Sequence, residues 1–240
     1  MTNATTQSKG APKGVLITFE GGDGAGKSTH IAFLAHEIRA HGVEAVCLRE
    51  PGGTPLGERL RAILLDPESD ICDESELLLY EAARAQLVET VVAPALERGA
   101  VVLSDRFADS TVAYQGVGRG LGVDLVARMN AFACRGIVPD RTILIVCASA
   151  QDGLARAVRR SGADRLELAG ADFHARVAEA FADIARTDPD RVRVVESAPR
   201  KPDTASAIFA ELKDLFPWMA DVRYHDGSAF SAFERIRVGR

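Results

Sequence analysis

The chain has 240 residues, of which 47% are hydrophobic, which is enough for one sizeable core and favours one main domain. The formal net charge is −5, which argues against a protein that holds nucleic acid through a general basic field. No apolar run approaches the ~20 residues of a membrane span, and residues 1–12 lack the apolar region of a signal peptide. We therefore expect neither a nucleic-acid partner nor a membrane.

Cysteine usage and the two ends of the chain extend this picture. Four cysteines are scattered without C-x-x-C spacing, which is typical of buried thiols in a reducing compartment and favours a cytoplasmic protein: Cys47, Cys72, Cys134 and Cys147. Residues 1–13 are expected to be disordered. Residues 216–240 have no clear hydrophobic period and are expected to form an extension that packs on the surface or stays loose, with a short hairpin around residues 226–227 as an alternative.

Five apolar runs predict strands, and most are separated by segments with helical periodicity: 14–19, 43–48, 100–104, 141–147 and 191–195. This alternation predicts an α/β fold with a parallel sheet and helices on both faces, in one domain over residues 14–215. Helices are expected at 27–40, 73–98, 172–186 and 205–215, and Pro94 should kink the second or start a new turn. Residues 49–57 hold two prolines and three glycines and are predicted to form a loop.

Residues 20–29 carry the most specific signal in the chain. They follow the first predicted strand, precede a predicted helix, and satisfy the pattern G-x-x-x-x-G-K-[ST] from Gly21 to Ser28. Glycines let several backbone N–H groups point at one place, and the helix N-terminus adds a positive dipole end, so the segment predicts a phosphate site. Lys27 would reach the outer phosphates of a nucleoside triphosphate, and the Ser28 hydroxyl would hold a magnesium ion.

Further basic and aromatic residues follow the other strands. Asp105 and Arg106 end the third strand, where a guanidinium fork could hold a phosphate or form a structural ion pair. Tyr80 and Arg84 share one helix face and could orient a planar base, although a core tyrosine beside a partly buried arginine is the alternative. A cluster around residues 161–163 predicts either a mobile lid that closes on phosphates or a solvated helix face: Arg156, Arg159, Arg160 and Arg165.

These groups predict two anion sites, one for a phosphoryl donor and one for an acceptor phosphate near Arg49, Arg84 and Arg106. A GTPase would need an N-K-x-D-like segment after a later strand, whereas residues 148–151 read Ala-Ser-Ala-Gln. Two rivals stay open at this point. One is a kinase for another nucleoside monophosphate or a deoxynucleoside, and the other is a binding protein in which ATP acts only as a switch.

The ordered set of motifs resembles bacterial thymidylate kinases, over about residues 14–215. It comprises Phe19 to Thr29, the Arg-Glu-Pro-Gly-Gly-Thr segment at 49–54, Ser-Asp-Arg-Phe at 104–107, Ala-Tyr-Gln-Gly at 113–116 and Gly-Arg-Gly at 118–120. The resemblance implies a five-stranded parallel sheet of the P-loop nucleoside monophosphate kinase fold. It also implies a homodimer that transfers the γ-phosphoryl group of ATP to dTMP with magnesium.

Site roles follow by matching positions. The resemblance implies that Gly21, Gly22, Asp23, Gly24, Ala25, Gly26, Lys27, Ser28 and Thr29 bind ATP, and that Ser28 and Asp105 serve the magnesium ion. Substrate contacts are implied for Asp23, Arg49, Pro51, Tyr80, Arg84, Asp105, Arg106, Thr111, Tyr114 and Gln115, with a cis-proline at Pro51. The phosphate loop has no arginine of its own, so the chain resembles the type whose extra catalytic arginine lies in a lid around residues 156–170. Catalytic roles are then implied for Asp23, Lys27, Arg106, Arg159 and Arg160.

Overall fold

A parallel sheet forms the centre of the molecule. The structure is a computed structural model that describes residues 13–147, 164–225 and 228–235. Five strands follow the order β2-β3-β1-β4-β5, all in parallel pairs, and they span Val15–Glu20 (β1), Ala45–Arg49 (β2), Val101–Asp105 (β3), Arg141–Val146 (β4) and Val192–Glu196 (β5). The five predicted strands and the α/β fold are confirmed, with ends that differ by one or two residues.

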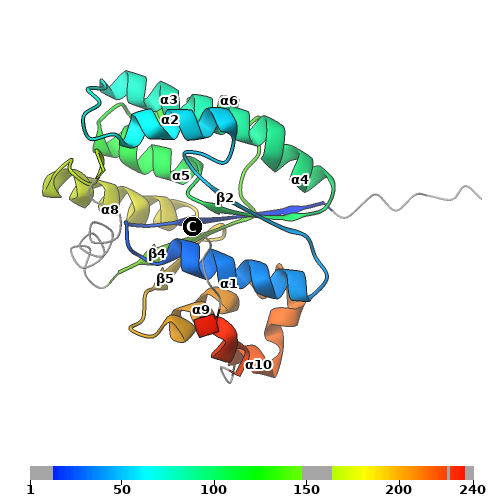
Figure 1. Cartoon of the computed structure of the whole chain (residues 1–240). Helices are drawn as coiled ribbons and strands as arrows, with labels where there is room; N and C mark the ends of the chain where they lie inside the picture. The colour runs from blue at the N-terminus through cyan, green and yellow to red at the C-terminus, as the bar shows by residue number, and fades with distance from the viewer. Residues whose placement is uncertain (1–12, 148–163, 226–227, 236–240) are drawn as a thin grey trace, which may run out of the picture.

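Helices connect the strands and cover both faces of the sheet (Figure 1). They are α1 (Lys27–Ala40), α2 (Pro55–Leu65), α3 (Asp73–Leu87), α4 (Ala93–Glu97), α5 (Ala108–Thr111), α6 (Val123–Ala133), α8 (Ala171–Thr187), α9 (Lys201–Ala210) and α10 (Val222–His225). Wider π-helical turns continue α3 at Val88–Val92 and α5 at Val112–Gly118. Helical residues run without interruption from α3 through the wider turns into α4, and Pro94 lies in the first turn of α4, as the expectation of a new turn at this residue had it. Within the described ranges, no helix has both the length and the apolar character that crossing a membrane requires.

Alternation along the strands assigns each face of the sheet its own core. Ile17 and Phe19 of β1 pack with α1 and α9 on one face, whereas Leu16 packs with α3 and α4 on the other. Leu144 of β4 packs with α8 on this second face. Because both faces are covered, β1 and β3 are mostly apolar, and each ends in an acidic residue at its carboxyl end, Glu20 and Asp105, where ligands of such sheets bind.

Helix α2 corrects the predicted loop at residues 49–57. The loop ends at Thr54, whose hydroxyl accepts a hydrogen bond from Gly57 N (2.9 Å), and Pro55 is the first helical residue. A proline suits this position because its ring presets φ and its missing N–H would have no partner in the first turn. The Thr-Pro pair was therefore a helix start and not a continuation of the loop.

The extension after residue 216 is packed and helical where it is described. Turns of 3-10 helix at Pro217–Ala220 and Ser228–Arg235 flank α10. The alternative of a hairpin had its tip at residues 226–227, which lie outside the described residues, but the segments on both sides of this tip are helical and not strands. Four of its aromatic or apolar side chains belong to the same core as α1 and β1: Met219, Tyr224, Phe230 and Phe233. The alternative of a loose extension is wrong for this part. Cys47 and Cys72 are exposed, so the expectation of buried thiols fails for these two.

Candidate functional site

A cavity of about 520 Å³ opens beyond the carboxyl ends of β1, β2 and β3. Its wall includes all ten residues for which the family resemblance implies a substrate contact: Asp23, Arg49, Pro51, Tyr80, Arg84, Asp105, Arg106, Thr111, Tyr114 and Gln115. Gly24, Gly26, Lys27, Ser28 and Thr29 of the phosphate loop line the same cavity. The fold thus brings together residues that the sequence analysis named in five separate segments.

The phosphate loop curls through three glycines with positive φ, at Gly21, Gly24 and Gly26. Gly21 lies against β4, where a Cβ would come 2.1 Å from Ile145 O, so this glycine serves packing and does not line the cavity. Lys27 Nζ donates to Gly21 O (3.1 Å) and Gly22 O (3.0 Å), and burial together with the charge of Arg106 lowers the pKa of its ammonium group. In this state the Lys27 ammonium group is therefore bonded to two carbonyls of its own loop. It would give up these bonds to bind a phosphate.

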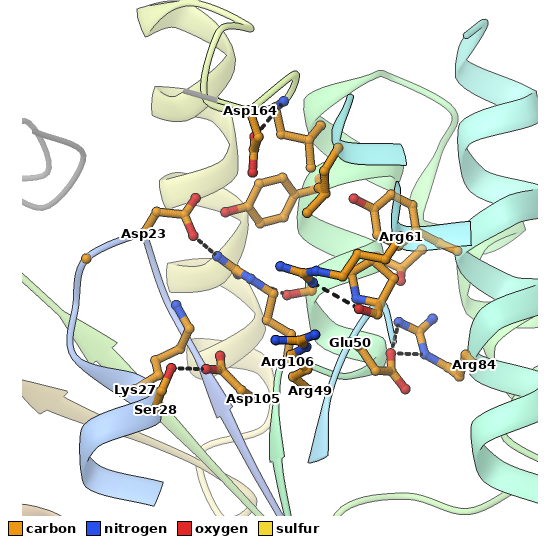
Figure 2. A pocket seen from close by; sticks show the side chains of 18 of the residues that line it. Asp23, Lys27, Ser28, Arg49, Glu50, Arg61, Arg84, Asp105, Arg106 and Asp164 are labelled. Atoms are coloured by element: carbon orange, nitrogen blue, oxygen red, sulfur yellow. Dashed lines mark hydrogen bonds and ion pairs between the residues drawn. The ribbon is translucent and has the colours of Figure 1, made fainter. Parts of the chain in front are cut away.

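Arg106 extends from the end of β3 to the phosphate loop (Figure 2). Its Nη2 donates to Asp23 Oδ1 (2.6 Å), its Nη1 donates to Gly21 O (3.2 Å), and its guanidinium carbon lies 5.1 Å from the centre of the Tyr114 ring. Burial alone would raise the pKa of Asp23, but the charges of Arg106 and Lys27 lower it, so this carboxylate stays ionised. The arrangement places a buried cation at the boundary between the donor loop and the rest of the cavity.

Arg106 also has a backbone φ of 72°, which is rare for a residue with a side chain and costs about 1–3 kcal/mol. Neighbouring bonds hold it there: Ser104 Oγ donates to Arg106 O (2.7 Å) and Arg106 N donates to Phe19 O (3.0 Å). Glu20 secures the next residue by accepting from Phe107 N (2.8 Å) and from Ser110 Oγ (2.6 Å). Burial raises the pKa of Glu20 to about 7.

Ser28 and Asp105 form a site that suits magnesium. Ser28 Oγ donates to Asp105 Oδ2 at 2.6 Å, beside Lys27 and at the cavity wall (Figure 2). Among the described residues, no group of three His, Cys, Asp or Glu side chains could form a metal cage. A hydroxyl and one carboxylate nevertheless fit Mg²⁺, which prefers oxygen ligands and usually keeps several waters beside substrate phosphates.

Arg84 has a different environment from the one that the sequence suggested. Four hydrogen bonds hold its guanidinium: Nε donates to Glu50 Oε2 at 2.8 Å, Nη1 donates to Glu81 and Asn130, and Nη2 donates to Phe107 O. Nη2 also forms an ion pair with Glu50 Oε2 at 2.7 Å. Its side chain is 1% exposed. Burial raises the pKa of Glu50 and of Glu81, and the positive charge of Arg84 opposes this effect. Arg84 lines the cavity, but in this state each of its three guanidinium nitrogens already donates to a protein acceptor.

Aromatic and polar groups line the remaining wall. Tyr80 and Tyr114 face the cavity, and the peptide bond between Glu50 and Pro51 is cis, as the resemblance implied. Thr111 Oγ1 is buried and has no hydrogen-bond partner among the described residues. Such a hydroxyl is costly to bury unless a ligand supplies the partner.

One of the four predicted lid arginines lies within the described residues. Arg156, Arg159 and Arg160 lie outside the described residues. Arg165 is described, but it donates from Nε to Leu64 O (3.0 Å) and its Nη2 lies 2.5 Å from the buried carboxylate of Glu76. Glu76 also accepts from Gln115 Nε2 (2.7 Å) and forms an ion pair with Arg119 (3.0 Å). Arg165 therefore anchors its segment to α2 and α3, in place of the expected phosphate contact.

Sequence reasoning missed several residues in the cavity wall, including Arg61, Asp164, Leu166 and Lys201. Arg61 is on α2 and donates to Pro51 O (2.9 Å), which directs its guanidinium into the cavity (Figure 2). The Thr54-Pro55 helix start was the signal that could have found it, because a helix from Pro55 places Arg61 less than two turns beyond the loop. Lys201 follows β5, at the strand end farthest from the acceptor groups.

A phosphate loop on one side of the cavity and a second set of cationic and aromatic groups on the other define a class. The chain has the fold of the P-loop nucleoside monophosphate kinases, enzymes that bind a triphosphate and a phosphorylated acceptor together.

Comparison with known proteins identifies the family. The family model described as thymidylate kinase matches residues 19–208. A thymidylate kinase of Deinococcus radiodurans is 46% identical over 202 residues, which are 84% of this chain and 98% of that protein. A thymidylate kinase of Pseudomonas fluorescens is 50% identical over 188 residues, 78% of this chain and 89% of that protein. The crystal structure of thymidylate kinase from Ehrlichia chaffeensis superposes with a TM-score of 0.67 at 32% identity, over 85% of this chain and 99% of the other. The chain belongs to the thymidylate kinase family.

Proposed function

We propose that this chain, as a member of the thymidylate kinase family, transfers the γ-phosphoryl group of ATP to dTMP and gives dTDP and ADP. The observation that carries this proposal is the common cavity, into which the phosphate loop and all ten substrate candidates project. Family membership disfavours the rival in which ATP acts only as a switch, and it favours dTMP over other acceptors.

On the donor side, residues 21–29 would bind the ATP phosphates through backbone N–H groups and Lys27. Lys27 Nζ, now on Gly21 O and Gly22 O, would exchange these carbonyls for the outer phosphates. Ser28 and Asp105 would hold magnesium, which when bound offsets the negative charge of the triphosphate. The extra positive charge would come from Arg159 and Arg160, by analogy with arginine fingers that contribute roughly 10³- to 10⁵-fold.

On the acceptor side, Arg106 would bind the dTMP phosphate while Asp23 fixes its direction. Arg49 and Arg61 lie near Arg106 in the cavity wall (Figure 2) and would add positive charge around the dTMP phosphate. An ionised oxygen of dTMP then attacks the γ-phosphorus, the bond to the β-phosphate bridging oxygen breaks, and ADP leaves. No strong general base is required, because the attacking oxygen carries no proton at neutral pH. Catalysis is therefore mostly positioning and charge stabilisation.

On the base side, Tyr80 would stack on thymine, Thr111 Oγ1 would gain the hydrogen-bond partner that the protein does not give it, and Tyr114 and Gln115 would close over the sugar and base. Arg84 would bond to the base only by exchanging one of its five protein contacts. The thymine methyl group itself would favour dTMP over dUMP by only about 1–3 kcal/mol.

The test is a coupled ADP-release assay with ATP, magnesium and, in turn, dTMP, dUMP, dCMP, UMP, AMP and thymidine. We expect dTMP to give the highest kcat/KM. Arg106→Ala should lower kcat/KM by about 10²- to 10³-fold, as loss of a charge-stabilising donor does. Arg98→Ala is the matched control, because Arg98 lies outside the cavity and pairs with Glu44 at the surface. Another monophosphate in first place would overturn the base-site assignment, and no stimulation by any acceptor would overturn the kinase proposal.

The partner protein that we propose is a second copy of the chain. Helices α3 and α6 present a largely apolar groove of about 440 Å³, in which Leu78, Leu125 and Phe132 are exposed, Phe132 by 86%. Contiguous exposed apolar side chains are unusual on a monomer and are typical of an association surface. Light scattering should give a dimer for the native chain and a monomer for Phe132→Glu. Val222→Glu, a change at an exposed residue on α10, should leave the dimer intact. A native monomer at micromolar concentration would contradict the proposal.

A further inference from the structure

The extension packs along the whole length of helix α1 on the face turned away from the sheet. Near the end of α1, the ring of Trp218 stacks on His41 with centroids 3.8 Å apart and planes at 14°. About one turn earlier along α1, Tyr224 Oη donates to Glu37 Oε2 at 2.8 Å. Both contacts join residues that are far apart in the sequence, and both lie on one stripe of the helix.

The same stripe continues toward the phosphate loop. Phe230 and Phe233 contact Phe33, with ring centroids 5.5 and 4.7 Å apart, and Phe233 also contacts His30 at 5.4 Å. Residue numbers in the extension therefore rise as residue numbers in α1 fall. The extension runs antiparallel to α1, and Phe233, its last described aromatic residue, reaches the first turn of the helix through its contact with His30. In Figure 1 the extension, from α10 onward, lies on the same side of the sheet as α1.

His30 is the residue through which this contact reaches the phosphate loop. The imidazole is 5% exposed, and a Cβ placed on Gly26 would lie 3.6 Å from His30 Cδ2 and 3.7 Å from Nε2. The ring therefore lies beside Gly26, so close that even one added methyl group would touch it, and Gly26 directly precedes Lys27 and Ser28. His30 N also donates to Gly26 O at 3.2 Å. Lys201, whose charge acts on His30, lines the cavity.

Packing alone fixes the orientation of this imidazole. His30 Nδ1 is buried and has no hydrogen-bond partner among the described residues, so no polar contact to Nδ1 orients the ring. Phe233 lies against it on the side of the extension, and Gly26 is its neighbour on the side of the loop, within the reach of one added methyl group. If the phenyl ring is removed, the imidazole gains space to rotate away from Gly26, because the adjoining atoms no longer fill that volume.

We propose that Phe233, acting through His30, is a positioning residue that holds the end of the phosphate loop in the conformation that binds ATP. This inference rests on the proposed function, in which the loop takes ATP, and extends it to a segment beyond residue 208, where the match to the family model ends. The extension is thereby part of the donor site and does not contact the acceptor side of the cavity.

The test compares Phe233→Ala with Trp218→Ala in steady-state kinetics, with ATP varied at saturating dTMP and dTMP varied at saturating ATP. The control removes a larger aromatic ring from the same extension, but at the opposite end of α1. We expect Phe233→Ala to raise KM for ATP by about 10-fold, less than the ~100-fold of a 1 Å misplacement, and to leave KM for dTMP unchanged. Phe233→Leu should restore most of the affinity, and Trp218→Ala should leave KM for ATP unchanged.

A double-mutant cycle tests the path through His30. In a His30→Leu background, Phe233→Ala should have little further effect on KM for ATP, because both changes act on the same contact. Full additivity, an unchanged KM for ATP, or equal rises in both KM values for Phe233→Ala would each overturn the inference. Each of these outcomes assumes that the native chain phosphorylates dTMP, so a native chain without that activity would instead refute the proposed function.

Discussion

Burial of His30 predicts a specific loss of stability in acid. Burial, together with the charge of Lys201, lowers the pKa of this imidazole from 6.5 to about 4. In the unfolded chain the imidazole takes up a proton near pH 6.5, whereas in the folded protein it stays neutral until about pH 4. The free energy of unfolding should therefore be unaffected by His30 above pH 7, and should fall as the pH drops from 6.5 to 4. The interval between the two pKa values corresponds to about 3 kcal/mol.

The assay is urea unfolding between pH 8 and pH 4, on the native chain and on His30→Leu. Other titrating groups are common to both, so the difference between the two curves isolates His30. We expect the native chain to lose about 3 kcal/mol more than the variant between pH 7 and pH 4. Parallel curves would refute the reasoning, and so would an NMR titration in which the His30 imidazole protonates near pH 6.5.

Three further changes test other parts of the structure. Thr54→Ala removes the hydroxyl that caps α2 and should lower the free energy of unfolding by about 1 kcal/mol, whereas the exposed Thr90→Ala should change it by less than about 0.5 kcal/mol in the same urea experiment. Glu76→Ala leaves two arginines beside an emptied buried site and should cost about 3–5 kcal/mol by the same measurement; a loss below about 1 kcal/mol would show that Arg119 and Arg165 find other partners. Asp105→Asn should raise the magnesium concentration for half-maximal turnover by about 10-fold or more, and an unchanged magnesium dependence would remove Asp105 from the metal site.

The sequence was most informative where local chemistry decides the structure. The glycine pattern with Lys27 and Ser28, and the alternation of apolar runs, were sufficient to predict the phosphate loop and the parallel sheet. Side-chain partners were not predictable, because they depend on contacts between distant segments. From the sequence, Arg84 and Arg106 were equally good candidates for binding a ligand. Only the structure reveals that Arg84 is hydrogen-bonded to the carboxylate of Glu50, 34 positions away. The sequence left open whether the extension packs or stays loose for a related reason: its aromatic residues have no period of their own, and their contacts are to α1.

The contacts of each arginine and lysine in the cavity separate cations that can bind a phosphate from cations that hold the fold. Lys27 donates to two backbone carbonyls, and Arg106, whose side chain is 17% exposed, donates to one carbonyl, to the Ser110 hydroxyl and to the carboxylate of Asp23. Carbonyl contacts are weaker than contacts to an anion, so a phosphate can replace them with a net gain. Arg84 is 1% exposed and is bonded to two buried carboxylates, which a ligand could displace only by leaving buried charges without a partner. Phosphate binding is therefore expected to move Lys27 and Arg106 while Arg84 stays in place.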